Sequence, residues 1–231
     1  MNSSITPLQK LQSILPQAQL RFQTLPALPG AEFLLLDPSL DDSVISSEQA
    51  EKLSDDPPYW IFCWASGQAM VAEIVQKSIA VAGKVVVDFG AGGGVVAIAA
   101  VLAGASRVYA CEIDPIARDV IAQNCQRNSV EVIVCDSLEA IPGPIDLLLA
   151  ADVLYEAENS KFLDWFLAAA PSVVVADSRI KNLMHPDYEH YFTAITTSFP
   201  DFKEAKANNE VRFYRRLEKF PFPPRDLEER K

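Results

Sequence analysis

The sequence contains no apolar run of about 18 residues, the length from which a membrane-spanning helix is recognised. Its amino-terminal stretch, MNSSITPLQK, also lacks the basic and then apolar pattern of a secretory signal peptide. We therefore expect neither a transmembrane segment nor a membrane partner, and we predict a cytoplasmic location.

Cysteine and histidine are scarce. The four cysteines are Cys63, Cys111, Cys125 and Cys135. They form no Cys-x-x-Cys pair, and two of them fall within predicted buried strands, which is typical of reduced thiols in a core. The histidines, His185 and His190, form neither a metal site nor an obvious catalytic pair, so we expect no metal.

Positively charged residues are also few: the chain has 20 lysines and arginines against 31 acidic residues, which gives a net charge of −11. Such a chain gains nothing from releasing the counterions of a nucleic acid, so we expect no DNA or RNA partner. The acidity is compatible with a basic substrate surface, but simple solubility explains it more readily.

The length of 231 residues and an apolar content of 49% suit one core of ordinary size. Strand and helix patterns alternate through the middle of the chain, and near-continuous apolar strands are typical of a parallel sheet covered on both faces. The expected strands are 84–89, 107–112, 131–135, 145–151 and 172–177, and the expected helices are 66–81, 93–104, 115–128 and 157–170.

The two ends of the chain are less regular. We predict an N-terminal extension over residues 1–55 and a larger domain over residues 56–231. The extension is expected to hold a helix over 6–15, a β-hairpin from 19–25 and 32–36, and a polar link over 41–56. The carboxyl end is expected to hold a helix near 186–198, antiparallel strands over 201–207 and 211–218, and a frayed tail over 222–231.

The most informative segment is VVVDFGAGGGVVAIAA, residues 85–100, which predicts a buried strand, a glycine turn and an apolar helix. Such a turn presents backbone N–H groups and a positive helix end to a ligand. The dinucleotide fingerprint would place its third glycine at Val95. Here the spacing is Asp88-x-Gly90-x-Gly92-x-Gly94, and an acid at Asp88 repels a pyrophosphate but attracts an ammonium group. The pattern indicates S-adenosylmethionine.

Acidic residues also end the next two predicted strands. Glu112 lies about 20 residues beyond the glycines, where a carboxylate is placed to accept hydrogen bonds from ribose hydroxyls. Asp114 is its rival, although with Pro115 it better fits the N-cap of the following helix. Asp136 ends the third strand, where it is placed to accept a hydrogen bond from the adenine amine. Each acid alone is as consistent with a helix cap.

Together these motifs resemble the class I, seven-strand S-adenosylmethionine-dependent methyltransferases over about residues 57–218. The resemblance implies an α/β, Rossmann-like three-layer sandwich with a seven-stranded, mostly parallel sheet whose last strand is antiparallel. It also implies that the Asp88–Gly94 turn holds the methionine moiety, Glu112 the ribose and Asp136 the adenine. The expected cofactor-binding residues are Trp64, Asp88, Gly90, Ala91, Gly92, Gly94, Glu112, Ile113, Asp136, Ser137 and Ala151.

The aromatic segment DPPYWIFCWASGQAM, residues 56–70, leads into the helix before the first sheet strand. Trp64 is placed to stack on the adenine or to wall the cofactor cleft. An aromatic staple that packs the helix onto the sheet explains it equally well.

The fourth strand ends in Asp152, Tyr155 and Glu156, where a substrate amine could be oriented and its developing charge stabilised. We expect Asp152 and Tyr155 to be catalytic. The alternative is that Asp152 is the N-cap of the 157–170 helix and Tyr155 a packing residue. The Asp-x-x-Tyr pattern is similar to that of the family-16 protein-lysine methyltransferases.

Four further motifs are Pro58-Tyr59-Trp60, Trp64-x-x-Gly67-Gln68, Gly104-Ala105-Ser106-Arg107 and Ile113-Asp114-Pro115-Ile116-Ala117. Together with Asp-x-x-Tyr they resemble the electron-transfer flavoprotein β-subunit lysine methyltransferases and nicotinamide N-methylase-like bacterial proteins. After the fifth strand the chain has Asp177-Ser178-Arg179, a partial departure from that group's Asp-Pro-Gly-Arg.

Asn124 and Asn128 lie four residues apart on the predicted 115–128 helix. We expect them to face solvent or to end the helix.

The leading hypothesis is a protein-lysine methyltransferase that uses S-adenosylmethionine, yields S-adenosylhomocysteine and acts on a protein with an exposed lysine as a monomer or weak dimer. One alternative is a small-molecule N-methyltransferase, which a closed aromatic pocket of Tyr59, Trp60 and Tyr155 would favour. The other is a catalytically silent binding module of the same fold.

Overall fold

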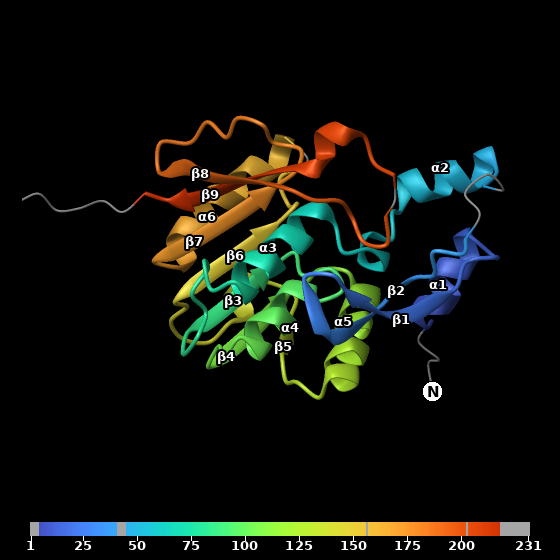
Figure 1. Ribbon diagram of the computed structural model, residues 1–231, viewed down its shortest axis with the longest axis horizontal. Coiled ribbons are helices and arrows are strands. Elements are labelled where there is room, and N and C mark those ends of the chain that lie inside the picture. Colours follow the sequence, from blue (N-terminus) through green and yellow to red (C-terminus); the bar gives the residue numbers. More distant parts are fainter. Residues whose placement is uncertain (1–4, 41–44, 156, 202, 218–231) are drawn as a thin grey trace, which may run out of the picture.

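The computed structural model describes residues 5–40, 45–155, 157–201 and 203–217. A central sheet carries helices on both faces, and a small hairpin lies beside it (Figure 1). The expected tail over 222–231 and part of the expected polar link lie outside the described residues. Within the described ranges, no helix combines the length and the apolar character that a membrane crossing requires.

The sheet has seven strands in the order β5-β4-β3-β6-β7-β9-β8. The strands are β3 (Val85–Phe89), β4 (Arg107–Cys111), β5 (Ile133–Cys135), β6 (Leu147–Ala151), β7 (Ser172–Asp177), β8 (Tyr188–Ile195) and β9 (Glu210–Arg216). Neighbours from β5 to β7 pair in parallel, whereas β9 is antiparallel to both β7 and β8. The predicted seven-stranded, mostly parallel sheet with an antiparallel last strand is confirmed.

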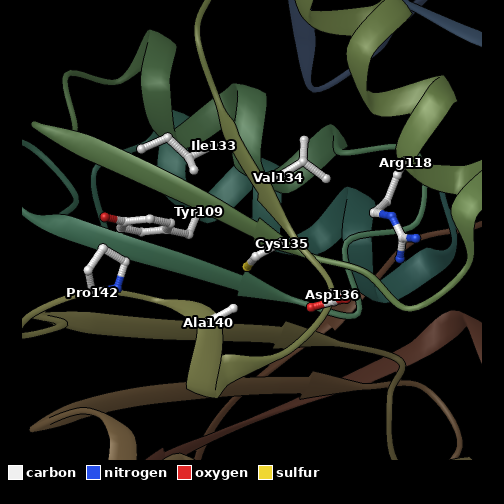
Figure 2. A pocket seen from close by; sticks show the side chains of 8 residues that line it. All are labelled: Tyr109, Arg118, Ile133, Val134, Cys135, Asp136, Ala140 and Pro142. Atoms are coloured by element: carbon white, nitrogen blue, oxygen red, sulfur yellow. The ribbon is translucent and has the colours of Figure 1, made fainter.

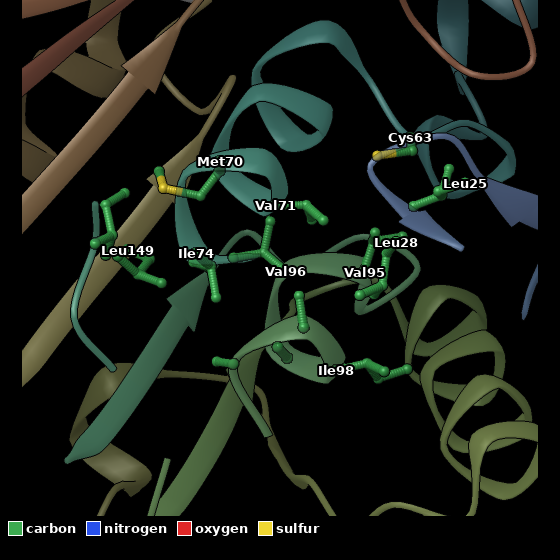
Figure 3. Packing of buried hydrophobic residues seen from close by; sticks show 14 of the residues in the cluster. Leu25, Leu28, Cys63, Met70, Val71, Ile74, Val95, Val96, Ile98 and Leu149 are labelled. Atoms are coloured by element: carbon green, nitrogen blue, oxygen red, sulfur yellow. The ribbon is translucent and has the colours of Figure 1, made fainter. Parts of the chain in front are cut away.

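Helices cover both faces and bury the apolar side chains that alternate along the strands. On one face lie α3 (Ala65–Val75), α4 (Val95–Leu102) and α5 (Pro115–Asn128). There Met70 and Ile74 of α3 belong to the same core as Leu149 of β6 (Figure 3). On the other face α6 (Phe162–Ala169) packs Phe166 against Leu148. The predicted three-layer sandwich is therefore confirmed.

The predicted helix near 186–198 is wrong, because Tyr188–Ile195 forms β8, the edge strand beside β9. Its sequence, YEHYFTAI, is rich in aromatic and β-branched residues that favour a strand. The predicted strand over 201–207 is also wrong in the described part of that segment. Lys206–Asn209 forms a 3₁₀ turn, and β9 takes its partners from β7 and β8 instead.

Several elements are shorter than predicted. The helix expected over 66–81 ends near Val75, because Lys77 has a φ of 65° and the N–H of Ile79 turns back to the carbonyl of Glu73. The expected 157–170 helix begins as a 3₁₀ turn, Ala157–Lys161, before α6. Of the expected 131–135 strand, only Ile133–Cys135 (β5) pairs with a neighbouring strand.

The amino-terminal segment forms the expected helix and hairpin. Helix α1 (Pro7–Ile14) begins at a capping box between Thr6 and Gln9. Strands β1 (Leu20–Leu25) and β2 (Leu28–Leu36) form an antiparallel hairpin, and α2 (Ser47–Asp55) occupies part of the expected link. Leu25 and Leu28 of the hairpin pack in the same core as α4 (Figure 3). The domain boundary after residue 55 stays a prediction.

Two asparagines of α5 fasten the hairpin to the rest of the molecule. Asn124 is fully buried, so the expectation that it faces solvent is wrong. Its Oδ1 accepts the N–H of Leu34 at 2.7 Å, and its Nδ2 donates to the carbonyl of Gly93 at 2.8 Å. Asn128 pairs in the same way with both backbone groups of Glu32. The Asn124 side chain thus joins β2 to the glycine turn.

We predict that Asn124→Ala lowers the free energy of unfolding by about 1–3 kcal/mol, because it leaves the buried N–H of Leu34 and the carbonyl of Gly93 unsatisfied. Urea unfolding followed by circular dichroism measures the change. Gln126→Ala, on the exposed side of α5, is the matched control and should stay within about 0.5 kcal/mol of the wild type. Equal losses in the two variants would contradict the prediction.

Candidate functional site

The candidate site lies where the direction of the strand connections reverses. β3 and β6 are neighbours, but β3 leads on to β4 on one side and β6 leads on to β7 on the other. The loops after β3 and β6 therefore diverge and leave a crevice at the carboxyl ends of the strands. Open α/β sheets bind their ligands at such points.

The glycine turn after β3 passes very close to the chain that leaves β6. Gly90, Gly92 and Gly94 have φ values of 69°, 54° and 75°, a region that favours glycine. A Cβ on Gly90 would lie 2.6 Å from Cγ1 of Val153, so no side chain fits there. A Cβ on Gly92 would meet nothing within 4 Å, so this part of the turn borders open space.

The turn is anchored to β4. The N–H groups of Gly90 and Ala91 both donate to the carbonyl of Cys111, at 2.9 and 3.2 Å. Glu112, which follows Cys111, accepts the N–H of Gly92 on Oε2 at 2.7 Å and that of Asp114 on Oε1 at 2.9 Å. Burial raises the pKa of the Glu112 carboxyl above its ordinary value. The predicted acid therefore lies directly against the glycine turn.

Asp88 is buried beneath the first turn of α4, where its Oδ2 accepts the N–H of Ala97 at 2.9 Å. Burial raises its pKa to about 7, the N–H of Ala97 opposes that shift, and the nearby Glu112 carboxylate adds to it. The structure thus shows Asp88 holding the helix that follows the turn. Its predicted contact with an ammonium group stays a prediction.

Asp114 accepts the N–H of Ile116 and is the N-cap of α5, with Pro115 in the first helical position. The expectation that Asp114 is a helix cap is therefore confirmed, and the ribose contact of Glu112 stays a prediction. Arg118 of α5 donates to the carbonyls of Glu112 and Ile113 and fixes the end of β4.

Beyond β4 and β5 the surface is open and partly apolar. Ile113 is 83% exposed. A pocket of about 450 Å³ is bordered by Arg118, Cys135 and Asp136, with Tyr109 at its other end (Figure 2). Ser137 follows Asp136 and is half-buried. An exposed apolar side chain after β4 and an exposed carboxylate after β5 are the chemistry that a flat base with an amine needs, and the adenine contact stays a prediction.

Asp152, at the end of β6 after the half-buried Ala151, has a φ of 53°. Its Oδ1 accepts the hydroxyl of Ser66 at 2.7 Å and both the N–H and the hydroxyl of Ser178, at 2.9 and 2.7 Å. Its Oδ2 accepts the N–H of Ser66 at 3.1 Å. Asp152 therefore ties the start of α3 to the end of β7. The alternative that it is the N-cap of the 157–170 helix is wrong.

Aromatic side chains form the outer edge of the crevice. Tyr155 is 43% exposed, and its ring centroid lies 5.4 Å from that of Tyr59. The ring centroid of Tyr59 in turn lies 6.0 Å from that of Trp64. Trp64 donates its Nε1–H to the carbonyl of Tyr59, and the guanidinium of Arg179 lies 5.9 Å from its ring. We call Tyr59, Trp64 and Tyr155 the aromatic rim.

Trp60 does not join the rim, because it is buried in the core below the hairpin. The closed pocket of Tyr59, Trp60 and Tyr155 that would favour a small-molecule acceptor is therefore not formed. Glu156 lies outside the described residues.

Sequence reasoning missed several residues that support the site. Ser66 carries no recognisable signal, because its partner Asp152 is 86 residues away. Asp177 is fully buried and accepts the N–H groups of Leu154, Arg179 and Ile180. Burial and the charge of Asp152 raise its pKa. The only available signal was its place in Asp177-Ser178-Arg179 after a predicted strand.

The known proteins that this chain resembles are methyltransferases. The family model described as ribosomal protein L11 methyltransferase (PrmA) matches residues 69–156. The electron transfer flavoprotein beta subunit lysine methyltransferase of Xenopus laevis is 32% identical over 174 residues, which cover 71% of this chain and 70% of the relative. The protein of that name from Mus musculus is 35% identical over 123 residues, 52% of this chain and 48% of the relative. The chain thus spans about half the length of this and the other mammalian relatives it matches.

Among solved structures, magnesium protoporphyrin IX methyltransferase from Synechocystis, crystallised with bound SAM, has a TM-score of 0.51 at 15% identity. The match covers 78% of this chain and 85% of that one. At this identity the likeness shows a shared fold.

The raised pKa of Asp88 makes stability depend on pH. The folded state binds this proton more tightly than the unfolded chain, whose Asp titrates near 3.8, so the contribution of Asp88 falls as pH rises from about 4 to about 7. We predict that Asp88→Asn, whose amide oxygen still accepts the N–H of Ala97, gains stability relative to wild type across this window, by at most about 1.4 kcal/mol per pH unit.

Urea unfolding at several pH values measures this difference. Asp119→Asn, an exposed substitution on α5, is the control and should follow the wild-type profile. If the unfolding free energy of Asp88→Asn changes with pH in parallel with that of the wild type, the Asp88 carboxyl is not the source of the pH dependence.

Proposed function

Because the chain belongs to the class I methyltransferase family that includes the electron transfer flavoprotein beta subunit lysine methyltransferases, we propose that it methylates a lysine side chain of a protein substrate. S-adenosylmethionine is the methyl donor and S-adenosylhomocysteine the product. The observation that carries the proposal is the glycine turn at the β3–β6 crevice, with the Glu112 carboxylate against its Gly92 N–H.

The residues at the crevice suit each part of the donor. The open side of the turn at Gly92 accommodates the methionine moiety, and Glu112 accepts hydrogen bonds from the ribose hydroxyls. Asp136 and Ile113 take the adenine. The donor supplies an electrophilic methyl group on a sulfonium, so the protein must chiefly position a neutral amine in line with it.

Asp152 is placed to receive that amine. Within the described part of the chain its Oδ2 receives one hydrogen bond, from the N–H of Ser66, and a carboxylate oxygen has two lone pairs. The remaining lone pair can orient the lysine amine and stabilise the positive charge that develops on nitrogen. The serine contacts hold this carboxylate still, and Tyr155 borders the path to it.

The aromatic rim supports a protein acceptor over a closed small-molecule site. Tyr59 and Tyr155 are each more than two-fifths exposed, so the methylenes of a lysine can pack against them from solvent. Their ring faces attract its ammonium before deprotonation. The net charge of −11 is compatible with a basic partner surface. The cytoplasmic location and the monomeric or weakly dimeric state remain predictions from the sequence.

We predict that the protein binds S-adenosylhomocysteine and that Gly92→Arg abolishes binding, because the new side chain fills the open space at the turn. Isothermal titration calorimetry measures both. Gly83→Arg is the matched control: Gly83 also has a positive φ and open space at its Cβ, but precedes β3 at the opposite end of the sheet. Absence of wild-type binding would favour the silent module.

We predict that Asp152→Asn lowers methyl transfer about 100-fold or more while S-adenosylhomocysteine affinity changes little, because the amide keeps some serine contacts but loses the charge. Transfer is measured with labelled donor and a cell lysate, followed by amino acid analysis for methyllysine. Asp146→Asn is the control, since Asp146 also accepts a strand N–H, that of Val85, away from the crevice. Full activity of Asp152→Asn would make this residue purely structural, and label confined to small molecules or RNA would reject the protein substrate.

A further inference from the structure

Two cysteines face each other at the cofactor end of the sheet. Cys111 is the last residue of β4 and Cys135 the last of β5, and the two are direct partners in the parallel ladder. Direct partners on neighbouring strands point to the same face of the sheet, and both side chains pack in the core below α6. All four cysteines are free thiols.

The two thiols lie side by side at the ends of β4 and β5. The Cys135 thiol donates to the carbonyl of Ala110 at 3.7 Å. The interaction with Cys111 lowers the pKa of Cys135, and the same interaction together with burial raises that of Cys111. Cys135 is therefore the better nucleophile of the pair.

Cys135 can also be reached from solvent. It is half-buried and borders the pocket of about 450 Å³ beside Asp136 and Arg118 (Figure 2). Cys111 lies behind it and is 4% exposed. A nucleophilic thiol that solvent can reach, next to a buried second thiol, is the usual arrangement of an attacking and a resolving cysteine.

We propose that Cys111 and Cys135 are a modification site, at which a hydroperoxide converts the two thiols into an intramolecular disulfide. The Cys135 thiolate attacks the terminal oxygen of the peroxide and the O–O bond breaks. That oxygen stays on the sulfur as a sulfenic acid, and the other leaves as water or an alcohol with the proton that the Cys135 thiol released. The Cys111 sulfur then displaces the hydroxyl, which departs as water with the Cys111 proton. Each sulfur loses one electron, and the peroxide gains two.

The backbone is already suited to this bond. Neighbouring strands lie about 4.8 Å apart, within the Cα separation of about 4.4–6.8 Å that disulfides span. The two sulfurs, which are free thiols here, must still approach to about 2.05 Å, so the ends of β4 and β5 must adjust.

That adjustment reaches the glycine turn, because the carbonyl of Cys111 holds the N–H groups of Gly90 and Ala91. The carbonyl of Cys135 holds the N–H of Glu112. The disulfide therefore weakens cofactor binding, a consequence that rests on the proposed function. By linkage, bound cofactor opposes disulfide formation to the same degree.

The first experiment tests the bond itself on the full chain. Trypsin cuts after Arg107, Arg118, Arg127 and Lys161 and so leaves Cys111, Cys125 and Cys135 on separate peptides. After treatment with stoichiometric hydrogen peroxide, we expect the free thiols to fall from four to two, with peptides 108–118 and 128–161 linked. Cys125→Ala should behave the same, whereas Cys135→Ser should form no such link. Four remaining thiols, or a link through other cysteines, would overturn the proposal.

The second experiment measures S-adenosylhomocysteine affinity in the reduced and oxidised wild-type protein. We expect oxidation to weaken binding about tenfold or more, within the range usual for coupled sites, and a reductant to restore it. Equal affinities would overturn the coupling. If the reduced protein does not bind, the proposed function fails and with it the coupling, while the peptide map still decides the disulfide.

Discussion

The structure depends on one constraint, which is that the backbone after β3 must pass against Val153 with no side chain between them. Glycine at position 90 meets that constraint, and the carbonyl of Cys111 and the carboxylate of Glu112 then hold the turn from the other side. The turn is fixed where the connections of two neighbouring strands diverge, and its Gly92 N–H is held by Glu112. The proposed contacts to the methionine moiety and the ribose take their positions from this turn.

The support beneath the turn is polar and buried. Asp88, Glu112 and Asp177 are carboxyl groups whose pKa values are raised by burial, and all three accept backbone N–H groups. Backbone donors keep such groups satisfied without a neutralising cation. The crevice floor is therefore acidic, which suits a donor that carries positive charge.

The parts of the site that the sequence predicted are those with local signals. The strand, the glycine turn and the helix of residues 85–100 follow one another, and Glu112 ends the next strand, so their positions follow from short-range patterns. Asp114 was assigned to a helix cap because Pro115 follows it, and that too is local. The parallel sheet with helices on both faces followed from the alternation of strands and helices.

The parts that failed depend on partners far along the chain. Asn124 bonds Leu34 90 residues away, and Asp152 bonds Ser66 86 residues away, so no pattern within a helix or strand indicates either contact. The composition of Tyr188–Ile195 favours a strand, but its partner β9 begins 15 residues further along the chain, so the segment itself does not indicate the pairing.

The buried amide of Asn124 has a consequence for how the molecule is put together. Through it the hairpin and the glycine turn share a rigid link, from Leu34 to Gly93. The amino-terminal segment is thus part of the crevice's framework and not a removable appendage. A macromolecule that binds the outer side of the hairpin would therefore contact a strand that a single side chain connects to the glycine turn.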